Sequence, residues 1–404
     1  MSNRFRYILI IVSVVLVFYI VIGGLLGEST STSEQTYKDL GVYSEVLSRI
    51  KSDYVTEPNL PKVTGGAIRG LLEALDPYST YFNPQQFKEY LEHPDPGPAG
   101  TGIFVSKKFG FATVVSVLPG SPADKAGIKA ADLLDRINGK PVRELSAVQI
   151  ERKLAGAPGT SVEIWVVNES RGEPQKLTLS RAILTPPPVQ TKMADSQTGY
   201  VHVATFNKGE SAEIASAVKK LVAQGADKIV LDLRDCAGGE ADEALKTASL
   251  FIQKGLITYT YGQRSARHDY MAEPEGTVFK LPVAVLINRA TAGPAEIVAD
   301  AILCDKRGDV VGVPSFGVGV VQKTIPVGDG SGLLLSVAKY YGPNGKAIEA
   351  NGVTPNIMVP TPGEVATLNG GAFVTPQQFG TKDDIQLQKA IDVLKQQSSP
   401  AKAA

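Results

Sequence analysis

The sequence predicts an α/β core, built of βαβ units around a mostly parallel sheet, joined to a β-rich domain, an N-terminal helical segment and one N-terminal transmembrane helix. Strand and helix patterns alternate through Tyr200–Phe206, Ser211–Gln224, Lys228–Leu233 and Ala241–Phe251, which is typical of βαβ units. Residues Tyr7–Leu26 form one apolar run. The remaining chain, within 404 residues of 43% hydrophobic content, is long enough for two or three domains.

The apolar run Tyr7–Leu26 carries no charge and is long enough for one helical membrane crossing. Arg4 and Arg6 precede it, so the positive-inside rule keeps the N-terminus in the cytoplasm and sends the rest outward. A cleaved signal peptide is the alternative, but Gly23–Gly27 is a poor match to a cleavage site. We expect an uncleaved signal anchor in the cytoplasmic membrane, with the bulk of the chain extracytoplasmic, in the periplasm.

The pattern of composition suggests further boundaries. Glu28–Gln35 is polar and reads as a spacer, and apolar residues at three- and four-residue steps in Tyr37–Ile50 predict one buried helical face. The proline run in Arg181–Pro188 predicts a stiff linker. The expected organisation is a signal anchor (1–27), a spacer (28–36), a helical segment (37–97), a β-rich domain (98–184), the core (185–362), and a C-terminal helix and tail (363–404).

Charge and metal-ligating residues exclude several classes of function. The 41 basic and 41 acidic residues balance, and without a basic run the chain is not expected to bind nucleic acid. The three histidines and two cysteines lack zinc-ligand spacing, so neither a metal site nor a cofactor is predicted. Cys236 and Cys304 would face an oxidising compartment, and whether they form a disulfide is left open by their spacing.

Residues Gly100–Leu184 resemble a PDZ domain. The more specific part of the match is Val114–Asn138, which contains S-P-A-x-x-A-G followed by a D-L-L-D-R-I-N turn. The turn of Gly100, Thr101, Gly102 and Ile103 corresponds to the carboxylate-binding turn of that family. The resemblance implies that backbone N–H groups of the turn hold the C-terminus of a polypeptide, while the peptide adds to the edge of the sheet.

Three tracts resemble the carboxyl-terminal processing (tail-specific) serine protease family with a PDZ domain: IVLDLRDCAGG at Ile229–Gly239, NRATAGPAE at Asn288–Glu296 and SFGVGVVQ at Ser315–Gln322. In that family a serine within T-A-S-A-S-E is activated by a lysine within F-G-K-G. Those positions here read Gly293 and Val318. Gln322 stands where the family places the glutamine that orients the lysine.

The resemblance therefore implies a catalytically degenerate member. A serine–lysine protease needs a hydroxyl that attacks and an amine that accepts its proton, and losing such a unit costs on the order of 10⁶ in turnover. Gly238 and Gly239 match the glycines of the family's oxyanion loop. Gly293 followed by Pro294 and Glu296 fits a helix start, and Val318 suits apolar space where a lysine stem would lie.

Another nucleophile is the alternative to consider. The thiol of Cys236 could attack a carbonyl if a neighbour lowered its pKa, and Thr291 and Ser315 carry hydroxyls near the lost positions. The sequence shows no evident base beside any of them.

Together these features predict a membrane-anchored extracytoplasmic PDZ protein on a serine protease scaffold. We expect a pseudo-protease that binds polypeptide C-termini, or that modulates an active relative through a homo- or hetero-oligomer. The alternative is an active tail-specific serine-type endopeptidase that uses an unrecognised nucleophile.

Overall fold

The computed structural model describes residues 37–93, 97–108, 111–168, 173–273, 278–361 and 379–398. The predicted signal anchor and spacer lie outside these residues. Among the helices that are described, none is both long and apolar enough to cross a membrane. The chain divides into two compact units, Met1–Ile68 and Arg69–Ala404.

The described part of the first unit is helical. One helix covers residues 37–53, and α2 (Leu60–Glu73) begins after a short turn and continues into the second unit. The predicted helix is present, but its apolar stripe is not buried, since Leu40, Tyr43 and Val46 are 39% to 57% exposed. The expectation of one buried helical face is therefore not met within the first unit.

The second unit opens with a short segment that joins the core sheet. Strand β1 (Thr80–Phe82) pairs antiparallel with β18 (Gly332–Tyr341). Helix α3 (Pro84–Glu92) follows and begins with a capping box between Asn83 and Gln86. Phe82 and Phe87 pack with Leu334, which fixes the segment against β18.

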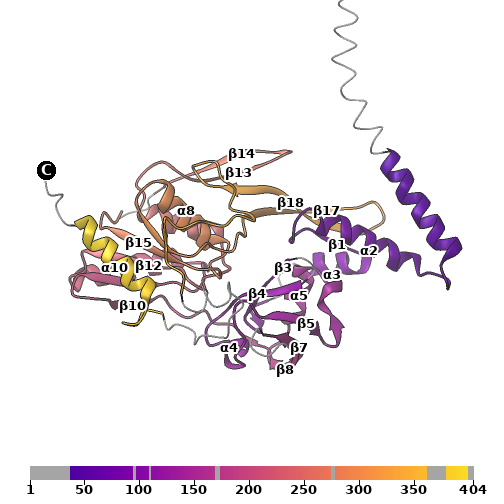
Figure 1. Cartoon of the computed structure of the whole chain (residues 1–404), viewed down its shortest axis with the longest axis horizontal. Coiled ribbons are helices and arrows are strands. Elements are labelled where there is room, and N and C mark those ends of the chain that lie inside the picture. The colour runs from indigo at the N-terminus through magenta and orange to yellow at the C-terminus, as the bar shows by residue number, and fades with distance from the viewer. Residues whose placement is uncertain are drawn as a thin grey trace, which may run out of the picture. The chain divides into compact units, whose positions relative to one another are not determined.

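A β-rich part follows, in which β3, β4, β5, β7 and β8 are labelled in Figure 1. Its main sheet has the order β3-β4-β5-β7-β8, so β3 (Ile103–Lys108) is an edge strand. Helix α5 (Ala147–Leu154) lies beside β3. The other members are β2 (Ala99–Gly100), β4 (Phe111–Val117), α4 (Pro122–Lys125), β5 (Leu133–Ile137), β6 (Lys140–Pro141), η1 (Val142–Glu144), β7 (Ser161–Val167), β8 (Gln175–Ser180) and β9 (Ala182–Ile183).

The core contains a six-stranded sheet in the order β10-β11-β12-β15-β16-β19. All neighbouring strands run parallel except β10 and β11. The strands are β10 (Gln190–Met193), β11 (Thr198–His202), β12 (Lys228–Asp232), β15 (Val283–Ile287), β16 (Gly308–Gly312) and β19 (Ile357–Met358). Helices α6 (Glu210–Ala223), α7 (Ala241–Ser249) and α8 (Pro294–Cys304) share one hydrophobic core with the sheet, and α10 (Ile385–Ser398) forms a second (Figure 1).

A second sheet in the core is antiparallel. Its order is β1-β18-β13-β14, with β17 also paired to β18. The additional strands are β13 (Leu256–Gly262), β14 (Ser265–Met271) and β17 (Val320–Pro326). The predicted mostly parallel core thus describes the six-stranded sheet, whereas this second sheet was not predicted.

A buried ion-pair network fixes the end of β12. Arg234 is fully buried and pairs with both Asp232 and Asp384, the latter at 2.7 Å. Asp384 precedes α10, so the network ties the C-terminal helix to the loop that follows β12. Pairing of this kind is what allows charges to lie in the core. The network therefore holds in place the first residues of the loop that contains Gly238 and Gly239.

Candidate functional site

Gly293 lies at the N-terminus of α8, directly after the loop that follows β15. Its backbone angles are φ 63° and ψ −120°, in a region that glycine tolerates far better than other residues. A Cβ atom added there would meet no heavy atom within 4 Å. The loop thus points position 293 into open space, but glycine supplies no hydroxyl.

Glu296, in the first turn of α8, holds this loop together with the loop around Val318. Its fully buried carboxylate accepts hydrogen bonds from Gly293 N at 2.8 Å and Val318 N at 2.8 Å. It also accepts from Gly317 N at 2.7 Å and Ser315 Oγ at 2.5 Å. Burial raises the pKa of Glu296 to about 7, and the hydrogen bonds oppose that shift. Sequence reasoning gave Glu296 only a helix-start role.

Val318 packs in an apolar cluster that joins the β-rich part to the core. The buried members are Val115, Ala237 and Ala292, and Phe104, Phe316 and Val318 pack against them. Phe104 belongs to β3 and Val115 to β4, so two strands of the β-rich part reach the position where the family carries its lysine. Val318 therefore offers no base and helps to fill the centre with apolar side chains.

The side chain of Gln322, on β17, forms a hydrogen bond with the backbone. Its side-chain Nε2 donates to the carbonyl oxygen of Tyr78 at 2.9 Å. The Tyr78 hydroxyl in turn donates to the carbonyl oxygen of Gly317 at 3.3 Å. Burial, reinforced by the nearby Glu296 carboxylate, raises the pKa of Tyr78 well above its ordinary range, so the phenol stays protonated and can donate.

The turn that carries Tyr78 lies between α2 and β1. Asp76 shapes it by accepting from Tyr78 N at 2.7 Å, and from Ser79 N at 2.6 Å and Ser79 Oγ at 2.8 Å. The turn lies directly beside the loop of Gly317 and Val318. Sequence reasoning missed this contact, because Tyr78 and Gly317 lie 239 positions apart in the chain.

The glycines of the loop after β12 have left-handed backbone angles, with φ 77° at Gly238 and 98° at Gly239. A side chain at Gly238 would collide with the ring of Phe104. Asp235 is also left-handed, with φ 56°, and its carboxylate accepts from Asn288 Nδ2 at 2.7 Å. The loop is thus well defined, and a side chain of β3 covers Gly238.

Pro294 lacks the backbone N–H that a strand–turn–helix elbow offers after its nucleophile, a feature that sequence reasoning did not identify. In a strand–turn–helix elbow, the backbone N–H of the residue after the nucleophile contributes to the oxyanion hole. Proline has no such N–H. The signal was visible in the sequence, because proline directly follows Gly293.

Among the described residues, Cys236 and Thr291 have no base beside them, whereas Ser315 donates to the Glu296 carboxylate in a pair that is buried on both sides. Burial raises the pKa of the fully buried Cys236 thiol well above its ordinary value. Thr291 Oγ1 donates to the carbonyl oxygen of Leu233 at 2.7 Å, and the Ser315 hydroxyl is buried against Glu296. Cys236 and Cys304 are both free thiols. Within the described ranges, no group of three or more His, Cys, Asp or Glu side chains could hold a metal ion.

The four residues predicted to bind a peptide lie together at the start of β3. Gly100 pairs within β2 and β9, and Ile103 begins the edge strand. Thr101 is only 1% exposed, and its hydroxyl has no hydrogen-bond partner among the described residues. Gly102 has φ 82° and packs closely against Ser121. The turn is therefore formed, with the Thr101 side chain buried inside it.

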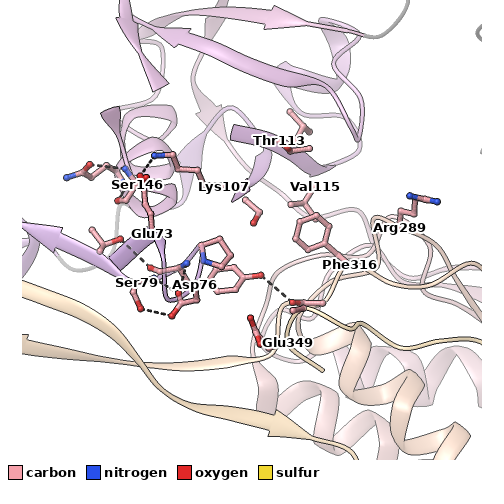
Figure 2. Close-up of a pocket in the computed structure, with 18 of the residues that line it drawn as sticks. Glu73, Asp76, Ser79, Lys107, Thr113, Val115, Ser146, Arg289, Phe316 and Glu349 are labelled. Atoms are coloured by element: carbon pink, nitrogen blue, oxygen red, sulfur yellow. Dashed lines mark hydrogen bonds and ion pairs between the residues drawn. The ribbon is translucent and has the colours of Figure 1, made fainter. Parts of the chain in front are cut away.

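A cavity of about 950 Å³ lies between the Tyr78 turn, the strands β3 and β4, and the loop around Phe316 (Figure 2). Val115 and Phe316 line it and also belong to the cluster around Val318. Neither Gly293 nor Val318 lines this cavity. The sequence gave no indication of it.

Comparison with known proteins identifies the family. Residues 197–359 match the model of peptidase family S41, and residues 113–168 match a PDZ domain. A carboxy-terminal-processing protease of Bartonella bacilliformis is 30% identical over 398 residues, which cover 91% of each chain. This chain belongs to the carboxy-terminal-processing protease family.

Further relatives agree with this assignment. The carboxy-terminal processing protease CtpA of Bacillus subtilis is 33% identical over 341 residues, covering 84% of this chain and 72% of that one. Among solved structures, the photosystem II D1 C-terminal processing protease matches with a TM-score of 0.65 and 26% identity, covering 79% of this chain and 92% of that one. The fold is thus the S41 protease fold with a PDZ domain, in which helices and sheets are mixed.

Proposed function

We propose that this family member is a pseudo-protease that binds polypeptide C-termini. The observation that carries the proposal is the pair Gly293 and Val318, which occupy the family's serine and lysine positions without a nucleophile or a base. Pro294 and the apolar cluster around Val318 support it, because they remove an oxyanion donor and fill the centre. The scaffold around them, with Glu296 and the glycine loop, remains ordered.

Binding of C-termini is supported by the PDZ domain. PDZ domains take up peptides by strand addition and hold the terminal carboxylate with backbone N–H groups. Here the Gly100–Ile103 turn leads into the edge strand β3. The buried hydroxyl of Thr101 has no partner among the described residues, and a bound carboxylate could supply one.

We also infer that the chain is anchored in the cytoplasmic membrane by Tyr7–Leu26, with its bulk in the periplasm. The support is the uncharged apolar run and the two arginines before it. A modulating role through mixed assembly with an active relative is favoured by one specific observation. The helix over residues 37–53 exposes an apolar stripe that a partner helix could bury.

The decisive experiment compares peptide cleavage by three versions of the full chain. The native chain should not cleave. Gly293→Ser with Val318→Lys should cleave weakly, because Pro294 still denies an oxyanion donor. Adding Pro294→Ala should raise turnover by about 10² to 10³, the usual effect of one such donor.

The matched control is Gly293→Ala with Val318→Lys and Pro294→Ala, which restores everything except the hydroxyl and should be inactive. Cleavage by the native chain that disappears in Cys236→Ala would instead establish an active endopeptidase with another nucleophile, and the pseudo-protease proposal would be withdrawn.

A further inference from the structure

Strand β14 (Ser265–Met271) ends the antiparallel sheet of the core and leaves one backbone edge unpaired. The sheet has the order β1-β18-β13-β14, and no described strand pairs with the far side of β14. Figure 1 shows β14 beyond β13, at the outer side of this sheet. The side chains from Ala266 to Asp269 are all exposed. An open edge of this kind is a template on which a strand of another chain can pair.

The exposed part of β14 is regular, and its side chains are held in place. The strand pairs with β13 without a break from His268 to Tyr270, and both irregularities of the register lie outside that stretch. The Tyr270 ring lies 4.7 Å from the His268 ring and 6.3 Å from the ring of Tyr340 on β18. The Arg267 guanidinium lies 3.8 Å from the centre of the Tyr259 ring on β13. The edge is therefore preformed.

The charges of β14 are arranged symmetrically. Charges on an edge strand usually prevent pairing, as a row of lysines does when two copies repel. This strand instead carries one charge of each sign, Arg267 and Asp269, directly on either side of His268. The two charged side chains share a face of the sheet, because alternate residues of a strand do, and they form an ion pair at 2.6 Å. The strand is therefore complementary to an antiparallel copy of itself.

One register satisfies both charges. When two copies of β14 run antiparallel about His268, Arg267 of each copy lies opposite Asp269 of the other, and the four charges alternate on one face. Tyr270 then lies opposite Ala266, so a large side chain meets a small one. Moving the axis by one residue would place two arginines or two aspartates opposite each other, and like charges directly opposite are destabilising. The charges thus select the register about His268.

We propose that β14 is an interaction surface for a second copy of this chain, whose own β14 pairs with it antiparallel about His268. The antiparallel sheets of the two copies then form one continuous sheet, with main-chain hydrogen bonds across the junction. Such an interface is two-fold symmetric and uses the same surface on both copies. The inference is independent of the proposed binding of C-termini, and it does not involve the apolar stripe of residues 37–53.

Charge reversal tests the pairing. The full chain, in detergent and labelled in two colours at an appended C-terminal tag, is examined by fluorescence cross-correlation, and the native chain should self-associate. Arg267→Asp and Asp269→Arg should each weaken self-association by about tenfold or more, because each puts like charges opposite one another twice across the interface. A mixture of the two variants should associate as the native chain does. The double variant should also recover, because its two charges have only exchanged places.

Disulfide trapping tests the position of the axis. His268→Cys places two thiols opposite each other, at a Cα separation of about 4.5 to 5.5 Å that a disulfide accepts, and should crosslink two copies under mild oxidation. Ala266→Cys is the matched control, because position 266 is exposed on the same strand and the same face. Its two copies lie about 14 Å apart along the strands, so it should not crosslink. Both variants carry Cys304→Ser, since Cys304 is the native thiol that is not fully buried.

Several results would overturn the inference. One is a native chain that does not self-associate, and another is self-association that persists in both single charge variants. Crosslinking through Ala266→Cys as efficient as through His268→Cys would place the axis elsewhere. If neither the mixture nor the double variant recovered, the single variants would have lost association for a reason other than charge, and the pairing would be contradicted. None of these results would affect the proposed function.

Discussion

The two positions that lack catalytic groups differ in what surrounds them. At Gly293 an added Cβ would meet nothing within 4 Å, and the backbone keeps a conformation that would present a side chain. At Val318 the space is largely occupied, because its half-buried side chain belongs, with Phe104 and Phe316, to an apolar cluster. Position 293 therefore lacks the catalytic side chain but keeps the space for one. Position 318, in contrast, has become part of the packing between the PDZ domain and the core.

Glu296 is the structural reason why the two positions stay together. Its carboxylate bonds to the backbone N–H of both Gly293 and Val318, at 2.8 Å in each case. The arrangement does not need a serine or a lysine, because its donors are backbone groups and the Ser315 hydroxyl. The two loops of a protease site can therefore stay in place without the catalytic side chains, as long as a buried carboxylate such as that of Glu296 still bonds to both.

The largest effect is expected from Val318→Lys, which places an ammonium in the apolar cluster. If burial lowers the pKa of the new lysine by about 3 units, the free energy of unfolding falls by about 4 kcal/mol at pH 7. Above the folded pKa, the lysine of the unfolded chain still binds a proton that the folded chain has released, so the free energy of unfolding rises with pH. The destabilisation caused by the substitution therefore shrinks to about 1 kcal/mol at pH 9.5. Urea unfolding at the two pH values measures this.

Val318→Met is the control, since it is long but uncharged and should cost less than about 1.5 kcal/mol at both pH values. A lysine variant that is as stable as the methionine variant at pH 7 would show that position 318 can reach water. The contrast with position 293 would then lose its physical basis.

The second effect concerns pH. The folded pKa of Glu296 is about 7 and its ordinary value is 4.5, so the folded state holds the proton over that interval while the unfolded state does not. Stability contributed by this group is present below pH 4.5 and is lost as the pH rises to 7, by about 3 kcal/mol in total. Glu296→Gln removes the titration. The difference in unfolding free energy between native chain and variant should therefore change across pH 4.5 to 7, and a constant difference would contradict the raised pKa.

Much of the local structure could be predicted from neighbouring residues. Gly293 and Pro294 do begin α8, because the requirements of a helix start are met within four residues. The contacts that define the site could not be predicted in this way. Tyr78 meets Gly317 from 239 positions away, and Glu296 bonds to residues 19 to 22 positions ahead.

The helix over residues 37–53 is a second case in which a local pattern predicts the element but not its contacts. Its apolar periodicity correctly predicted a helix, but a pattern cannot say which element covers the apolar face. The cavity was beyond prediction for a related reason, since its walls come from stretches that only the fold brings together.

The smallest expected effect is that of Gly293→Ala. Open space around the added Cβ leaves only the backbone cost, and a non-glycine residue in a sparsely populated φ/ψ region costs of the order of 1 to 3 kcal/mol. We expect about 2 kcal/mol by urea unfolding, with unchanged peptide binding. Gly209→Ala is the matched control, because Gly209 is also an N-cap glycine with positive φ and open space, but at φ 94° and ψ −5°, nearer the ordinary left-handed region. It should cost about 1 kcal/mol. If Gly293→Ala alone lowered the free energy of unfolding by well above 4 kcal/mol, the added side chain would have to clash with neighbouring atoms. Position 293 would then be occupied like position 318, and the contrast between the two positions would fail.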